Sequence, residues 1–143
     1  MVNSSPGLYL AGAFAFLFYN RRFLVLEERP EKKKYDLDLP GGTLEPSEDP
    51  VAGLRREVRE ETGLEIAEAF PLCYLKYDQH ESGRSILVGF YIGTASSSDV
   101  TISKEHVGYR WITREEFENS PMTVSLDKKY VVELLDAYPA VTT

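Results

Sequence analysis

Three glutamates in one short segment could bind a metal ion: Glu57, Glu60 and Glu61. At about 100° of rotation per residue in a helix, their side chains project from one side. Neighbouring carboxylates destabilise a helix by roughly 0.2–0.5 kcal/mol per pair, and a bound cation removes that repulsion. Carboxylates are hard oxygen ligands that suit Mg²⁺ or Mn²⁺. The segment therefore predicts a divalent-metal site on a helix, with a solvated acidic helix face as the alternative.

The glutamates belong to a longer pattern with fixed spacing. Five residues separate Gly42 from Glu48, and seven separate Glu48 from Arg56. The full pattern has seven fixed identities and two apolar positions: Gly42, Glu48, Arg56, Glu57, Val58, Glu60, Glu61, Gly63 and Leu64. This segment resembles the complete Nudix box, and the flanking segments 39–41 and 109–112 are also similar to the family. The chain is identified by this resemblance as a member of the Nudix (MutT-like) hydrolase family.

The resemblance implies a fold, an activity and a cofactor. The implied fold class is α/β, the Nudix fold, in which a mixed β-sheet is sandwiched between α-helices, and residues 1–143 form one such domain. The implied activity is metal-dependent hydrolysis of a diphosphate bond in a nucleoside diphosphate linked to another moiety. Mg²⁺ or Mn²⁺ is the implied cofactor. The family acts on several nucleotide-like substrates and is often dimeric, so the substrate and a homodimeric state stay open.

The resemblance also implies roles for individual residues. The backbone carbonyl of Gly41 and the side chains of Glu57, Glu60 and Glu61 are the implied metal ligands. Arg56 is implied to orient these carboxylates, and it precedes Glu60 by four residues, a spacing that permits an ion pair on a helix. Glu57 and Glu60 are also two of the three candidates for the general base.

A fourth carboxylate is expected on a loop that faces the box, where many family members use a glutamate as metal ligand or base. Glu105, six residues before Trp111, occupies that place and is the third candidate for the base. Glu81 is the competing choice on another loop. We favour Glu105, with an exposed glutamate of no special role as the common alternative. Glu48 precedes the helix, where it could be structural or functional.

Three rival functions have weaker support. A non-catalytic Nudix-fold sensor would bind nucleotide without cleaving it, but such a protein is expected to lack box carboxylates that this chain retains. An isomerase acting on prenyl diphosphates would need a catalytic cysteine, whereas Cys73 lies in a predicted strand after the box. A zinc protease would need an HExxH pattern, which His80 and His106 do not form. His106 neighbours Glu105 and could contact substrate, but we favour an ordinary loop histidine.

Size, charge and cysteine content limit the remaining classes of protein. The chain has 143 residues, a usual length for one domain. Its formal net charge of −7 argues against nucleic-acid and membrane-surface binding, although cations could bridge the protein and an anionic substrate. Cys73 is the single cysteine, so an internal disulfide is excluded and a cytoplasmic location is expected. The apolar run 7–19 is too short for a membrane span and lacks the basic start of a signal peptide.

Apolar patterning predicts strands on both sides of the box. Leu8–Tyr19 and Arg22–Leu26 are expected to form a hairpin with a turn at Asn20. Four further strands are predicted, of which the second and third pair across the polar segment 78–84: Asp36–Leu39, Leu72–Tyr77, Ile86–Thr94 and Val107–Ile112.

Two helices are predicted. The first lies in the box, where Asp49 suits the N-cap, Pro50 the first helical position and Gly63 the C-terminal stop. Its buried stripe consists of Val51, Leu54 and Val58. This stripe is about 100° around the helix from the mean direction of the glutamates, so we expect the glutamates to stay accessible. The second helix is predicted from about Leu126 to Ala137.

Overall fold

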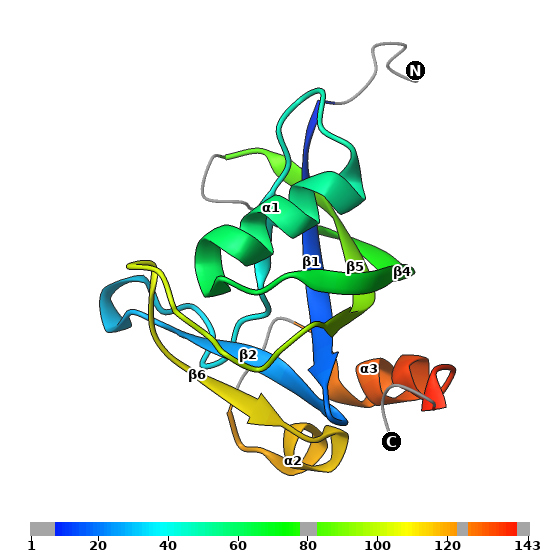
Figure 1. The fold of residues 1–143 in the computed structure, drawn as a ribbon. Coiled ribbons are helices and arrows are strands. Elements are labelled where there is room, and N and C mark those ends of the chain that lie inside the picture. Colours follow the sequence, from blue (N-terminus) through cyan, green and yellow to red (C-terminus); the bar gives the residue numbers. More distant parts are fainter. Residues whose placement is uncertain (1–7, 78–82, 123–125, 140–143) are drawn as a thin grey trace.

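The computed structural model describes residues 8–77, 83–122 and 126–139 (Figure 1). Its strands are β1 (Tyr9–Tyr19), β2 (Arg22–Glu28), β3 (Gly41–Thr43), β4 (Ile66–Tyr77), β5 (Ser85–Ala95) and β6 (His106–Ile112). Its helices are α1 (Pro50–Thr62), α2 (Arg114–Asn119) and α3 (Lys128–Leu135), with a short 3-10 turn η1 (Pro30–Lys32).

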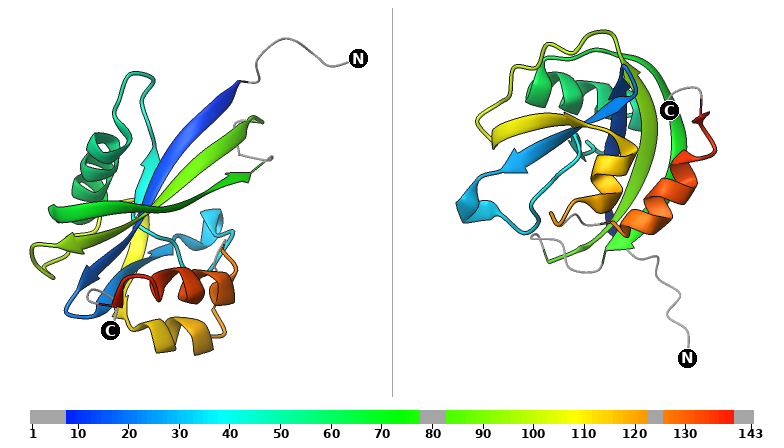
Figure 2. Two further views of the ribbon diagram at one scale, coloured as in Figure 1. Left: turned by 90° about the vertical axis from the view of Figure 1, so that its right-hand side faces the viewer. Right: turned by 90° about the horizontal axis from the view of Figure 1, so that it is seen from below.

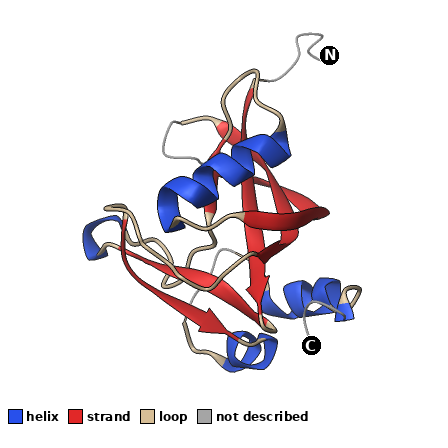
Figure 3. Cartoon of the chain, in the orientation of Figure 1, coloured by secondary structure: helices blue, strands red, loops and turns tan. Residues whose placement is uncertain are grey.

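The strands form one mixed sheet in the order β4-β5-β1-β2-β6, with β3 also paired to β1 (Figure 3). β1 and β5 run parallel, from the pair Tyr9–Ser85 to the pair Phe18–Thr94. The other paired strands are antiparallel, including β4 and β5, whose pairing the sequence predicted. β3 and β2 pair with successive parts of β1, so the glycines of β3 lie beside the centre of the sheet.

Helices pack on both faces of this sheet (Figure 2). On one face, Leu54 and Val58 of α1 join a buried cluster with small and branched residues of β1 and β2. On the opposite face, Phe117 of α2 and Val131 and Leu135 of α3 pack against the phenylalanines of β1, β2 and β5. The predicted sandwich of a mixed sheet between helices is therefore confirmed. None of the helices in the described ranges is long and apolar enough to cross a membrane.

The β1–β2 hairpin has the turn that its sequence predicts. Asn20 and Arg21 adopt φ values of 50° and 65°, the left-handed conformation that a two-residue type I′ turn requires at both positions. Asparagine tolerates this conformation better than most residues. The tight turn fixes the pairing of Phe18 with Phe23, whose rings pack 5.4 Å apart in the core.

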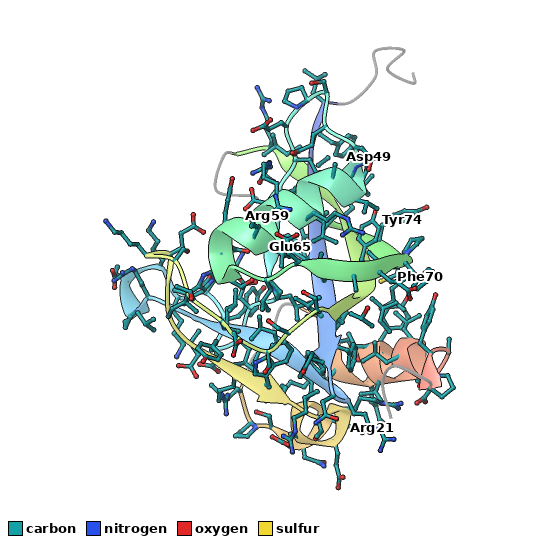
Figure 4. The ribbon with its side chains drawn as sticks, in the orientation of Figure 1. Arg21, Asp49, Arg59, Glu65, Phe70 and Tyr74 are labelled. Carbon is teal, nitrogen blue, oxygen red and sulfur yellow. The ribbon has the colours of Figure 1, made fainter. Side chains whose placement is uncertain are left out.

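Helix α1 begins and ends where its sequence signals predict. The Asp49 side chain accepts hydrogen bonds from the backbone N–H groups of Val51 and Ala52, and Gly63 ends the helix with φ 73°. Across this end, Arg59 of the last turn and Glu65 beyond the helix form an exposed ion pair of 2.6 Å (Figure 4). The caps fix the length of the helix and therefore the position of the carboxylates in its last turns.

Several predicted boundaries are wrong. The segment Asp36–Leu39 makes only an isolated bridge from Asp38 to Leu26 and no regular strand. The sequence missed β3 and α2 altogether, and β4 begins at Ile66, six residues before the predicted start. The last helix spans Lys128–Leu135 and is shorter than predicted at both ends; it begins at Lys128 because the Asp127 side chain caps its first turn.

Candidate active site

The carboxylate of Glu61 lies at the centre of the candidate site. Glu61 is in the last turn of α1 and is only 5% exposed. Its Oε1 accepts a 2.7 Å hydrogen bond from the backbone N–H of Gly41. Gly41 has φ 144°, and a Cβ at this position would collide with the carbonyl oxygen of Ala13 on β1. Glycine therefore allows β3 to present a backbone donor to a buried carboxylate.

Glu57 lies four residues earlier on α1, against Gly42. A Cβ on residue 42 would lie 2.6 Å from the carboxylate carbon of Glu57, so this glycine leaves the space that the carboxylate fills. Glu57 accepts a 3.0 Å hydrogen bond from Arg56. Burial raises the pKa of the Glu57 carboxyl group, and the Arg56 guanidinium partly opposes that rise.

Arg56 connects the carboxylates of the box. Its guanidinium forms a bidentate pair with Glu48, with Nε–Oε2 2.7 Å and Nη2–Oε1 2.9 Å, and hydrogen bonds from Arg56 hold the pKa of Glu48 at about 2. The same guanidinium contacts Glu57 at 3.0 Å and Glu60 at 3.3 Å. The predicted pair between Arg56 and Glu60 is therefore present. The contacts of Glu48 support its structural interpretation, since it anchors the arginine that holds the other carboxylates.

The loop between β5 and β6 passes along the C-terminal end of α1 (Figure 1). The Ser103 N–H donates a 3.0 Å hydrogen bond to the backbone carbonyl of Glu61. This contact brings the next residues of the loop to the site, so that single donor atoms of Glu61, Glu105 and His106 all lie within 4.8 Å of one another. Side chains from the helix α1, from the β5–β6 loop and from the first residue of β6 therefore lie close together.

His106 is buried between two carboxylates. Its Nε2 lies 3.5 Å from Oδ2 of Asp38, and its Nδ1 lies 3.8 Å from Oε2 of Glu61. Nδ1 is buried and has no hydrogen-bond partner among the residues that the structure describes. Asp38 is held in place through its other oxygen, Oδ1, which accepts a 2.9 Å hydrogen bond from the Leu39 N–H.

The site places the buried carboxyl group of Glu61 beside other carboxylates. Burial raises the pKa of Glu61 to about 9, and the nearby carboxylates of Asp38, Glu105 and Glu57 raise it further. The Gly41 N–H opposes this rise but does not cancel it. Without a cation, burial and the neighbouring carboxylates therefore favour the protonated form of the Glu61 carboxyl group. A positive ion at this point would favour its ionised form.

The structure brings together most of the residues that the sequence predicts for the site. Glu57, Glu61 and Glu105 lie close enough for their charges to interact, beside Gly41. Glu60 is on the same helix, but its side chain is 59% exposed and pairs with Arg56. Glu81, the competitor of Glu105, lies outside the described residues.

Sequence reasoning missed two features of the site. The expectation that His106 is an ordinary loop histidine is wrong, because it is the first residue of β6 and is 6% exposed. Its position directly after Glu105 was the available signal. Asp38 was not singled out, and no local pattern could reveal it, because its bridge to Leu26 depends on long-range pairing.

Comparison with known proteins finds a matching family model and a relative of similar sequence. A family model described as the NUDIX domain matches residues 8–135. A protein of Bacillus subtilis (strain 168) named "Putative 8-oxo-dGTP diphosphatase" is 26% identical over 106 residues, which cover 74% of this chain and 68% of the relative.

Solved structures share the fold at lower identity. The MutT protein from Methanosarcina mazei Go1 superimposes with a TM-score of 0.74 at 23% identity, over 96% of this chain and 97% of that one. A UDP-X diphosphatase gives a TM-score of 0.73 at 14% identity, over 96% of this chain and 66% of that one. Likeness at this level of identity establishes the fold, and one fold supports many substrates.

Proposed function

Because the chain belongs to the Nudix family and is accordingly a pyrophosphohydrolase, we propose that it cleaves a diphosphate linkage in a nucleotide-like substrate with the help of a divalent cation. The observation that carries this proposal is the convergence of the Glu57, Glu61 and Glu105 carboxylates beside Gly41. Glu61 is the buried member of this group, and a carboxylate is costly to bury without a counter-ion, so its place beside the other two favours a cation-binding role.

The donor atoms suit a hard divalent cation. Glu57, Glu61 and Glu105 would hold it, and we include Glu60 and the Gly41 carbonyl as further ligands on the strength of their place in the box. Carboxylate and carbonyl oxygens are the ligands that Mg²⁺ and Mn²⁺ prefer. When bound, such a cation neutralises charge on the diphosphate and makes water a better nucleophile.

The residues of the chain then have separate tasks. Arg56 positions the carboxylates of Glu57 and Glu60 through its ion pairs, while Glu48 anchors Arg56. One of Glu57, Glu60 and Glu105 accepts the proton from the attacking water. Because this step requires an ionised carboxylate and loss of a proton from water, turnover should be higher on the alkaline side of neutrality. A rate optimum near about pH 5 would contradict this assignment.

The substrate class is a nucleoside diphosphate linked to another moiety. The name of the Bacillus subtilis relative makes 8-oxo-dGTP the first compound to test. The panel should also contain dinucleoside polyphosphates, nucleotide sugars, ADP-ribose and coenzyme A, because proteins of this fold differ in substrate.

The test measures phosphate release with Mg²⁺ or Mn²⁺ after coupling to a phosphatase. We expect at least one compound to be cleaved to a monophosphate product. A matched Glu57→Gln preparation controls for contaminating enzymes, since their activity would survive this substitution. Absence of cleavage across the whole panel with either cation, or equal cleavage by the variant, would overturn the proposed function.

A further inference from the structure

The imidazole of His106 presents a nitrogen to the cluster of carboxylates. The His106 side chain is 4% exposed, and its Nδ1 has no hydrogen-bond partner in the described part of the chain. The separation of 3.8 Å between Nδ1 and Oε2 of Glu61 is too long for a hydrogen bond. A buried ring nitrogen without a partner is unfavourable, because burial removes the hydrogen bond that water would supply.

The other side of the ring indicates which nitrogen carries the proton. Nε2 lies 3.5 Å from Oδ2 of Asp38, and a carboxylate at this side favours the tautomer with the proton on Nε2. The Nδ1 lone pair then faces Oε2 of Glu61, and one donor atom of the ring lies within 4.8 Å of donor atoms of Glu61 and Glu105. Metal-binding histidines characteristically have this arrangement, in which a carboxylate accepts the ring N–H that is not used for the metal.

We propose that His106 Nδ1 is a nitrogen ligand of the divalent cation, together with Glu61 and Glu105, and that Asp38 orients the ring. This inference rests on the proposed function, because it concerns the cation of the same site. Two ligands of one cation lie about 3.0 Å apart at right angles and about 4.2 Å apart across the ion, for bonds of about 2.1 Å. The 3.8 Å between Nδ1 and the Glu61 oxygen falls within that range.

A nitrogen ligand changes which cation the site prefers. Imidazole suits later transition metals, whereas Mg²⁺ binds oxygen ligands almost exclusively. Affinity rises from Mn²⁺ to Co²⁺ at sites of this kind. The site should therefore bind Co²⁺ more tightly than Mg²⁺, and loss of His106 should reduce Co²⁺ affinity much more than Mg²⁺ affinity.

The first test loads the full chain with Mn²⁺ alone and measures the coupling between the Mn²⁺ electron spin and ¹⁴N by pulsed electron paramagnetic resonance. The sequence has two histidines, so His80→Asn leaves His106 as the single imidazole. We expect histidine-type ¹⁴N coupling in the wild type and in His80→Asn, and its loss in His106→Asn. Absence of coupling in the wild type, or its persistence in His106→Asn, would overturn the proposal.

The second test uses Asp38→Asn, which leaves the imidazole in place and so avoids a cavity in the core. Loss of a carboxylate that orients a ligand typically lowers metal affinity about 10–100-fold. We expect a Co²⁺ affinity lower by about that factor and an Mg²⁺ affinity changed less than about threefold, both measured by titration. Equal losses for the two cations, or no loss for Co²⁺, would contradict the role of the Asp38–His106 pair.

These readouts separate the two proposals. If ¹⁴N coupling is absent while Mg²⁺ supports hydrolysis, the nitrogen ligand is wrong and the hydrolase stands. If the coupling is present while no compound of the panel is cleaved, the cation site stands and the proposed function is wrong.

Discussion

Replacing Glu61 with glutamine should change stability and turnover in opposite directions. Glutamine keeps the size and the helix propensity of glutamate, and its side-chain oxygen can still accept the hydrogen bond from Gly41. It removes an ionisable group whose pKa is raised to about 9 by burial and by neighbouring carboxylates. The metal-free variant should therefore be more stable than the wild type at alkaline pH, whereas turnover with Mg²⁺ should fall.

The sign and size of the stability effect follow from the pKa. Between pH 4.5 and about 9, the unfolded chain has released the Glu61 proton and the folded chain still holds it, so the free energy of unfolding falls as pH rises. The full rise in pKa corresponds to an upper limit of about 6 kcal/mol, at about 1.36 kcal/mol per pKa unit. Water that enters the site when Glu61 ionises reduces this cost. We therefore expect the free energy of unfolding of Glu61→Gln to exceed that of the wild type by about 2–3 kcal/mol near pH 8.5 and by almost nothing near pH 4.5.

The assay is urea unfolding in excess EDTA at several pH values, with turnover measured separately at saturating Mg²⁺. Glu60→Gln is the matched control for stability, because Glu60 lies on the same helix with a side chain that is 59% exposed. Turnover of Glu61→Gln should be lower by a factor of about 10² to 10³, the usual cost of lost electrostatic stabilisation. Turnover near that of the wild type would refute the metal-site assignment, and an unchanged pH dependence of stability would refute the buried ionisable carboxylate.

Two further pairs of variants test the site. Gly42→Ala should lower turnover at least about tenfold with a small change in melting temperature, because its Cβ would lie 2.6 Å from the flexible end of Glu57. Gly41→Ala should cost about 1–3 kcal/mol of stability in urea unfolding, because its Cβ meets backbone and φ is 144°; a reversed order of stabilities would contradict this geometry. Glu105→Gln should lower turnover more than Glu81→Gln, and greater damage from the Glu81 change would show that the wrong fourth carboxylate was chosen.

Local signals explain why the sequence predicted α1 so well. Asp49 caps the helix through its own side chain, and Gly63 ends it with a left-handed conformation that suits glycine. Both interactions involve residues within a few positions along the chain, so residue type alone reveals them. The position of the box glutamates on one side of the helix followed directly, but the expectation that all of them are accessible is wrong for Glu61, which is 5% exposed because it lies against Gly41 and His106.

Long-range pairing explains what the sequence could not predict. The alternation of polar and apolar residues in Asp36–Leu39 correctly indicates that Leu37 and Leu39 are buried. Burial does not require a regular strand, however, and in this segment Asp38 alone forms a backbone bridge, to Leu26. The contact of Asp38 with His106 arises because β2 pairs with β6 while Leu26 also bridges Asp38. No local pattern records these pairings, so the buried nitrogen of the site emerged only from the structure.

Chelation of the divalent cation tests the central claim most directly. The measurement follows cleavage of the best compound in the panel with Mg²⁺, then in excess EDTA, and again after Mg²⁺ or Mn²⁺ is restored. We predict that cleavage stops in EDTA and resumes when either cation is added back, because the carboxylates of Glu57, Glu61 and Glu105 cannot by themselves neutralise a diphosphate. Full turnover in excess EDTA would contradict a metal-dependent hydrolase at this site.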